Sequence, residues 1–205
     1  MGKELLKAVV KAVVNMDEET WEASGQFFRT KQLKKKEYFL RQGEHCKHIG
    51  FVVKGYVRLY YQLDDMDKTK DFNTEGNFCG SYASFISEVP SHFNVVAMED
   101  LELLLINRAD LMALTEKHMA WQKFLRIAMQ SMFIAKENRE AAFLTLSPEE
   151  RYNDLMNTKP EWINRIPLKY LASYLGLTAE TISRIRAGKL SPGKKRLSPG
   201  ITPKV

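Results

Sequence analysis

The sequence predicts an α+β protein in which helices flank an antiparallel β-barrel, a long helix follows, and a small helical domain comes next. Three observations predict this order: apolar residues at helical spacing near the N-terminus, short strand-like runs between residues 30 and 106, and helical spacing again after residue 107. The 205 residues suffice for one ordinary domain or two small ones. An apolar fraction of 44% with 27% charged residues is typical of packed proteins and excludes a mainly disordered chain.

The first 28 residues are predicted to be helical. Leucines and valines recur at helical spacing in residues 5–14, and the acidic residues 17–19 indicate the start of a second helix. The pattern then changes to short runs rich in Val, Tyr, Phe and Leu, separated by glycine or by Asp and Asn. These runs cover residues 49–53, 56–61, 70–72, 93–97 and 101–106. Several short strands at this spacing are typical of a small antiparallel barrel or sandwich.

A long helix with two apolar faces is predicted after residue 107. One face is a heptad seam formed by Trp121, Leu125, Ala128, Met132 and Ala135, and continued by Arg139 and Ala142. The second face holds Phe124, Ile127 and Ile134. A helix with two apolar faces needs two partners, so we expect one face to pack on the barrel and the seam to pack on the same helix of a second chain. A purely intramolecular core helix is the alternative.

A capping box and a change in charge mark the start of the last domain. Ser147 stands at the N-cap position, Pro148 follows at the first helical position, and Glu150 lies three residues after the cap. Residues 1–150 hold 20 Lys and Arg against 22 Asp and Glu, net −2, whereas residues 151–205 hold 11 against 3, net +8. A basic end beside a near-neutral domain indicates nucleic acid or an anionic surface as partner, with a solvated basic tail as the alternative.

Residues 166–186 have the pattern of a helix-turn-helix. Pro167 is suited to start the first helix, Gly176 supplies the positive φ angle of a tight turn, and Thr178 caps the second helix. The inward-facing residues are Leu168, Leu171, Ala172, Leu175, Ile182 and Ile185. The exposed face of the second helix carries Ala179, Glu180, Ser183, Arg184 and Arg186. A polar face of this size fits the DNA major groove, whereas an ordinary helical hairpin is the alternative.

The order of these parts resembles the family of the cyclic-AMP receptor protein and the fumarate and nitrate reductase regulator (CRP/FNR). Residues 38–44 and 49–58 look like that family's glycine-glutamate turn and the strand-glycine-strand after it, and residues 76–80 look like the entry into its phosphate-binding cassette. The resemblance implies a cyclic-nucleotide-binding-like jelly roll, a dimerisation helix and a winged helix-turn-helix. The expected parts are a sensor barrel at 1–117, a dimerisation helix and hinge at 118–146, a DNA-binding domain at 147–188 and a flexible basic tail at 189–205.

The resemblance also assigns DNA-reading residues. The family's base-reading glutamate and second arginine match Glu180 and Arg184, a pair that suits a G·C-containing half-site because glutamate accepts from cytosine and arginine donates to guanine. The family's first base-reading arginine falls at Ala179, which predicts a different operator sequence. Ser183 is the third residue expected in the major groove. The residues expected at backbone phosphates are Lys169, Thr178, Thr181 and Arg186.

The implied ligand pocket departs from the family's pattern. The family's ribose-binding glutamate and phosphate-binding arginine fall at Ser81 and Ser91. The matching pocket residues are Gly80, Ser81, Tyr82, Ser91, His92, Ile134 and Ala135. A buried phosphate without a charge partner costs several kcal/mol, so we expect a regulator that cyclic AMP does not control. Arg58 or His92 would restore nucleotide binding only in a different pose.

The remaining groups of cysteine, histidine and other reactive residues support no cofactor and no metal. Cys46 and Cys79 are too few for a disulfide framework or for the four-cysteine cluster of the family's iron–sulfur branch. His45, Cys46 and His48 leave open a metal-dependent barrel enzyme of the cupin kind, although residues 45 and 48 of a strand point to opposite faces. No serine-histidine-acid or paired-carboxylate arrangement supports catalysis.

These observations together predict a homodimeric transcription regulator that binds an inverted-repeat operator with half-sites about one helical turn apart. The expected partners are double-stranded DNA and a second copy of the chain, with RNA polymerase and an unidentified small-molecule effector as candidates. A cytoplasmic location is expected, because no apolar run approaches the roughly 18 residues of a membrane span and the N-terminus lacks the apolar core of a secretory signal. A cyclic-nucleotide-responsive regulator and a metal-dependent barrel enzyme are the alternatives.

Overall fold

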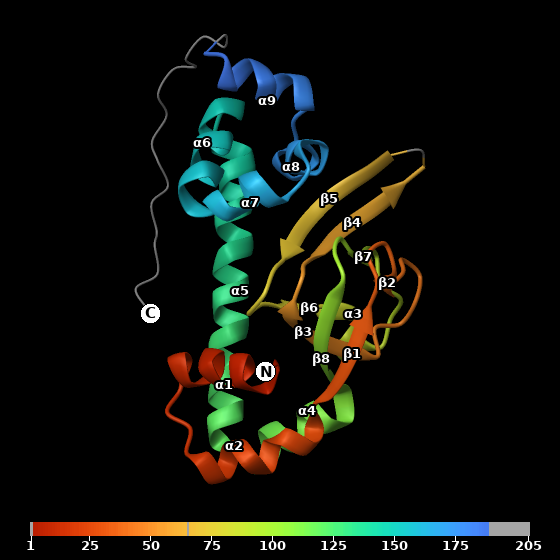
Figure 1. The fold of residues 1–205 in the computed structure, drawn as a ribbon, viewed down its shortest axis with the longest axis vertical. Helices are drawn as coiled ribbons and strands as arrows, with labels where there is room; N and C mark the ends of the chain where they lie inside the picture. Colours follow the sequence, from red (N-terminus) through yellow and green to blue (C-terminus); the bar gives the residue numbers. More distant parts are fainter. Residues whose placement is uncertain (1, 65, 189–205) are drawn as a thin grey trace. The chain divides into compact units, whose positions relative to one another are not determined.

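Residues 2–64 and 66–188 are described by a computed structural model, whose helices and strands are drawn in Figure 1. The chain divides into two units, Met1–Ala128 and Met129–Val205. The first unit holds the strands and the flanking helices, and the second holds the helix-turn-helix. The expected basic tail at residues 189–205 lies outside the described residues.

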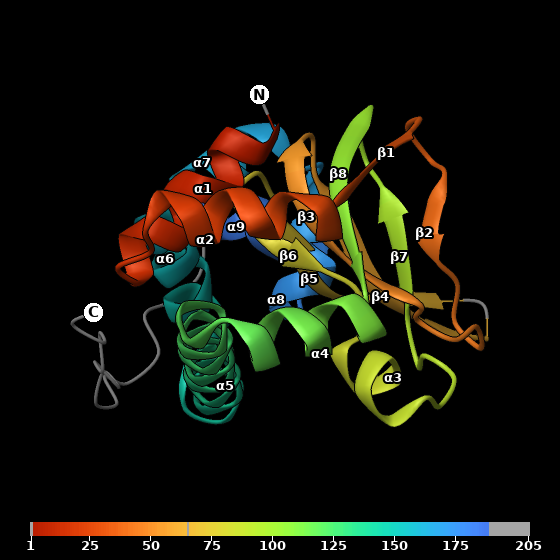
Figure 2. The same ribbon diagram turned by 90° about the horizontal axis from the view of Figure 1, so that it is seen from below.

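Two helices precede the strands, as predicted. They are α1 (Gly2–Val13) and α2 (Glu18–Ser24), and a single 3-10 turn, η1 (Gly25–Phe27), leads into the first strand. Asp17 caps α2, because its carboxylate accepts a hydrogen bond from the Thr20 N–H at 2.7 Å. In α1, Leu6 and Val10 are fully buried and belong to the same core cluster as the strands. Figure 2 shows α1 and α2 along one side of the sheets.

Within residues 2–64 and 66–188, eight strands form two four-stranded antiparallel sheets, in the orders β1-β8-β3-β6 and β2-β7-β4-β5. Their bounds are β1 (Arg29–Leu33), β2 (Tyr38–Leu40), β3 (His48–Lys54), β4 (Val57–Leu63), β5 (Met66–Asn73), β6 (Phe78–Cys79), β7 (Asn94–Ala97) and β8 (Leu101–Asn107). Apolar side chains from both sheets share one core, which includes Phe51, Leu59, Val95 and Leu104. The predicted antiparallel jelly-roll class is confirmed, although the two sheets are separate and the barrel is not closed.

All five strand-like runs of the sequence fall on strands, namely β3, β4, β5, β7 and β8. The strands outside those runs are short or polar: β6 has two residues, and four of the five residues of β1 are exposed. The short helix α3 (Tyr82–Ser87) follows β6 and was not predicted. Six residues are too few to show a helical period, so this helix left no pattern to read.

The segment after residue 107 forms two helices, α4 (Arg108–Lys117) and α5 (Met119–Thr145), separated at His118. Trp121 is only 3% exposed, and its ring lies 6.2 Å from the ring of Trp21 and 5.6 Å from that of Phe28. Trp121 therefore belongs to the core of its own unit, and it is not part of the interface between chains that the heptad seam predicted. Leu125 is half-buried against the same core.

The second unit continues from α5 into α6 (Pro148–Thr158), α7 (Pro160–Arg165), α8 (Leu168–Leu175) and α9 (Ala179–Arg186). The predicted capping box at Ser147 is formed in both directions, with bonds of 2.8 and 3.3 Å to Glu150. The buried side chains of this unit are Tyr152, Leu155, Trp162, Ile166, Leu171, Ala172, Leu175 and Ile182. Its described residues, 129–188, are helices and connections only, so the wing implied by the family resemblance is not seen among them. None of the helices in the described part of the chain is long and apolar enough to cross a membrane.

Candidate nucleic-acid interface

The turn between α8 and α9 has the backbone that the sequence predicted. Gly176 ends α8 in the left-handed region, with φ +67° and ψ +33°. The N–H of Leu177 donates to the carbonyl of Ala172 at 2.8 Å, which closes the turn. Thr178 caps α9, since its hydroxyl accepts a hydrogen bond from the Thr181 N–H at 3.1 Å. Ile182 is fully buried and anchors α9 on the rest of the unit.

The three residues expected to read bases lie on the exposed side of α9. Glu180, Ser183 and Arg184 are all exposed, and the Glu180 carboxylate forms an ion pair with the Arg184 guanidinium one helical turn away. Both side chains of this pair are more than half exposed, so the pair contributes little to the stability of the helix. The arrangement places an acceptor and a bidentate donor next to each other on one outward face.

The residues expected at phosphates differ in how they are held. Lys169 is exposed on α8, with its ammonium 4.7 Å from the centre of the Tyr170 ring. The Thr178 and Thr181 hydroxyls lie 2.9 Å apart at the start of α9. Arg186 turns back toward α6, where its Nε donates to the Tyr152 hydroxyl at 2.8 Å. Arg186 therefore helps to attach α9 to its own unit.

Two arginines that sequence reasoning did not assign to this site contact the turn. Arg139 of α5 donates through Nη2 to the carbonyl of Tyr174 at 2.9 Å. Arg151 of α6 donates through Nε to the carbonyl of Leu175 at 3.2 Å. Burial lowers the pKa of Arg151 from its ordinary value, although a guanidinium stays protonated at neutral pH. The signal in the sequence was a charged residue, Arg139, inside an otherwise apolar heptad seam.

Among the residues that match a nucleotide pocket, Ser91 is hydrogen-bonded within its own loop. Ser81 and Ser91 are buried, and the Ser91 hydroxyl donates to the Phe93 carbonyl at 2.8 Å while accepting from the Phe93 N–H at 3.3 Å. His92 is exposed. Ile134 and Ala135 lie on the part of α5 that belongs to the second unit. None of the matched positions carries an arginine or lysine.

Arg58 does not supply the missing cation. Its guanidinium forms two hydrogen bonds to the Asp67 carboxylate, at 2.8 and 2.7 Å, and its Nε donates to the Thr69 hydroxyl. Its neighbours Val57 and Leu59 belong to the core cluster. Because successive strand residues point to opposite faces, Arg58 lies on the face of β4 turned away from that core.

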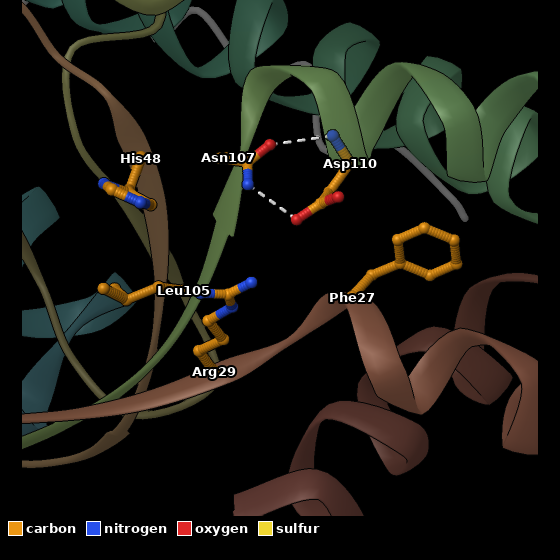
Figure 3. Close-up of a pocket in the computed structure, with 6 residues that line it drawn as sticks. All are labelled: Phe27, Arg29, His48, Leu105, Asn107 and Asp110. Atoms are coloured by element: carbon orange, nitrogen blue, oxygen red, sulfur yellow. Dashed lines mark hydrogen bonds between the residues drawn. The ribbon is translucent and has the colours of Figure 1, made fainter.

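Two cavities lie elsewhere on the first unit. Figure 3 shows the smaller one, of about 50 Å³, lined by Phe27, Arg29, His48, Leu105, Asn107 and Asp110. In it, Asn107 donates to the Asp110 carboxylate at 2.6 Å. The larger one, of about 550 Å³, is lined by Lys31, Phe39, Leu40, Glu44, His45, Cys46, Lys47, His48 and Leu105. Neither cavity includes the unit-one residues matched to a nucleotide pocket.

The candidate metal and redox residues do not gather into a site. Within residues 2–64 and 66–188, no three His, Cys, Asp or Glu side chains come together as metal ligands would. His48 is partly buried, and its pKa is lowered by that burial and by the nearby charges of Lys31 and Arg29. Cys46 and Cys79 are buried free thiols whose pKa values burial raises. Such thiols are poor nucleophiles and poor redox sensors.

Comparison with known proteins identifies the fold. Residues 30–118 match the family model of the cyclic nucleotide-binding domain. Among solved structures, the catabolite activator protein of Thermus thermophilus is similar over 85% of this chain and 84% of its own, at 23% identity and a TM-score of 0.55. FixK2 of Bradyrhizobium japonicum is similar over 78% of this chain and 83% of its own, at 21% identity and a TM-score of 0.65. A search of curated proteins finds no match.

A third solved structure extends the likeness to nearly a whole regulator. The c-di-GMP responsive global regulator CLP of Xanthomonas campestris is similar over 87% of this chain and 97% of its own, at 16% identity and a TM-score of 0.66. Identities this low establish the fold alone. Residues 30–118 match the cyclic nucleotide-binding domain, and the chain shares the fold of these solved regulators.

Proposed function

We propose that this chain is a homodimeric transcription regulator of the CRP/FNR type that reads an inverted-repeat operator. The observation that carries the proposal is the outward face of α9, where Glu180, Ser183 and Arg184 are exposed on a helix anchored by buried Ile182. A helix of this length with a donor and an acceptor side by side fits the major groove. Lys169, Thr178 and Thr181 are proposed to contact phosphates, with Arg186 acting mainly through its bond to Tyr152.

The proposed dimer forms through the remainder of the seam on α5. In that seam Met132 is 37% exposed, and beside the seam Phe133 is 62% exposed, so a second chain packed here would bury apolar surface of both. Ala128 and Ala135 are small and allow a second helix to approach closely. A two-fold dimer places one α9 in each of two neighbouring major grooves, which requires an inverted repeat. Such a regulator acts in the cytoplasm, and activation would bring RNA polymerase as a further partner.

We also propose that cyclic AMP does not control the regulator. A cyclic nucleotide carries one negative charge at its phosphate, and the position that would neutralise it is Ser91, whose hydroxyl is bonded within its own loop. Arg58 is neutralised by Asp67 on the far face of β4. The desolvation free energy of a buried phosphate without a cation would exceed the favourable free energy of the remaining contacts.

A cyclic-nucleotide-responsive regulator is the second candidate, because residues 30–118 match the cyclic nucleotide-binding domain. Titration calorimetry with cyclic AMP and cyclic GMP separates the two. We expect no saturable heat with either nucleotide. A saturable heat with one molecule bound per chain would favour the second candidate.

The proposed function is tested by selecting bound duplexes from a random pool at physiological salt. We expect enrichment of an inverted repeat with G·C pairs in each half-site. The matched control is Arg184→Ala, which keeps the fold because this side chain is exposed, and which should relax the preference at one position of each half-site. No enrichment by the parent chain would refute the proposal.

A further inference from the structure

The C-terminal end of α8 is held by groups from two other helices. The last four carbonyls of an α-helix have no partner within the helix. In α8, the turn's own N–H groups serve two of them: Leu177 donates to Ala172, and Gly176 donates to Ser173 at 3.2 Å. The other two carbonyls, of Tyr174 and Leu175, accept from arginine side chains outside α8.

Those arginines come from the segments on either side of the α5–α6 connection. Arg139 lies near the end of α5 and also stacks over the Tyr174 ring, 4.1 Å from its centre. Arg151 lies in α6 and makes a second bond, from Nη1 to the carbonyl of Leu146 at 2.9 Å. Arg151 therefore spans from the end of α5 to the end of α8. Positive charge at a helix C-terminus also interacts favourably with the helix dipole.

An aromatic ring lies close to both arginines and against the turn. The Phe143 ring has both guanidinium groups 5.2 Å from its centre. A Cβ atom at Gly176 would lie 2.9 Å from Cε1 of the same ring. The Phe143 side chain is 40% exposed, so it contributes more to the geometry of this turn than to the buried core of the unit.

We propose that Arg139, Phe143 and Arg151, named here the turn clamp, are positioning residues that fix the direction of α9 relative to the end of α5. The inference rests on the proposed function, because a fixed direction matters only if α9 enters a groove. α9 begins three residues after Gly176 and is capped at once by Thr178, so little flexible chain separates it from the clamped turn. A dimer built on α5 would then present two recognition helices at one fixed separation.

The test is the preference for half-site spacing. On the selected operator, inserting one base pair between the half-sites shifts them by about 3.4 Å and rotates them by about one tenth of a turn. The parent chain should bind the extended duplex about tenfold more weakly, the scale of one lost base contact. The test variants are Arg151→Lys and Arg139→Lys, which keep the charge but place all donors on one nitrogen and cannot reproduce the fork.

We expect both variants to bind the operator about tenfold more weakly, the scale of one charge-assisted hydrogen bond. Their penalty for the inserted base pair should fall toward onefold, and their affinity for random-sequence duplex should change less than about twofold because the charge is kept. The matched control is Lys136→Gln, an exposed charge on the same helix outside the clamp. The control should keep the parent's spacing penalty.

Four outcomes would overturn the inference. Variants that keep the parent's spacing penalty would show that the clamp does not set the direction of α9. Variants whose α8 and α9 amides lose protection from hydrogen exchange would show that the arginines hold the fold rather than the orientation. A parent chain that binds the operator with no spacing penalty would show that the direction of α9 is not fixed. A parent chain that binds no duplex would refute the proposed function and this inference together.

Discussion

Replacing Gly176 by alanine tests whether the turn before α9 is as constrained as its geometry indicates. An L-residue in the left-handed region costs about 1 to 2 kcal/mol, and Gly176 has φ +67°. The new Cβ would also displace the Phe143 ring from its place close to two guanidinium groups, contacts worth about 0.5 to 1 kcal/mol at exposed sites. The sum predicts that Gly176→Ala lowers the local stability of the helix-turn-helix by about 1.5 to 3 kcal/mol.

Hydrogen exchange read by mass spectrometry gives this local free energy, since the peptides around buried Leu171 and Ile182 report opening of the second unit alone. The control is Gly43→Ala in the first unit, read from the peptides around buried Val95; it has a φ of +87° with no atom within 4 Å of the new Cβ and should cost only the backbone component of about 1 to 2 kcal/mol. In the double variant with Phe143→Ala, Gly176→Ala should cost only the backbone component. A cost below about 0.5 kcal/mol for Gly176→Ala, or no coupling to Phe143, would show that this turn is not constrained.

Three further predictions concern single side chains. Arg184→Ala should weaken binding to the selected operator by about 1 to 3 kcal/mol and leave binding to random-sequence duplex far less affected, as measured by fluorescence anisotropy. Trp121→Phe should cost far less than Trp121→Ala in urea unfolding, about 1 against 3 to 5 kcal/mol, because the buried indole N–H has no partner among the described residues and its loss removes a desolvation penalty. Burial raises the pKa of the Cys79 thiol, so iodoacetamide should label this thiol at pH 8 only after the protein unfolds. The neutral thiol's contribution to the free energy of unfolding is complete below the unfolded-state pKa of about 8.5, and it declines as the pH rises toward the folded-state pKa.

Local signals in the sequence predicted the parts of the fold that short-range chemistry determines. The capping box at Ser147, the left-handed glycine at 176 and the cap at Thr178 each depend on neighbours within four residues, and each is present in the structure. The five apolar runs became strands for the same reason, since alternation and β-branched content act within one strand.

Contacts between segments that are distant in the sequence could not be predicted from it. The heptad at Trp121 indicated a packed face but not its partner, which is Trp21 of the same unit, a hundred residues earlier. Arg139 and Arg151 contact carbonyls 35 and 24 residues away, and a backbone carbonyl leaves no mark in the sequence. The sequence showed at Ser91 that the nucleotide pocket departs from the family's pattern, but the bonds of its hydroxyl to Phe93 depend on how the loop folds.

In the proposed complex, two chains place their α9 helices in neighbouring major grooves. Sedimentation of the chain with the selected duplex, compared with the same duplex carrying one scrambled half-site, tests this claim most directly. We expect two chains per intact duplex and a loss of at least about a hundredfold in affinity when one half-site is scrambled. One chain per duplex, or equal affinity for both duplexes at about 0.15 M salt, would contradict it.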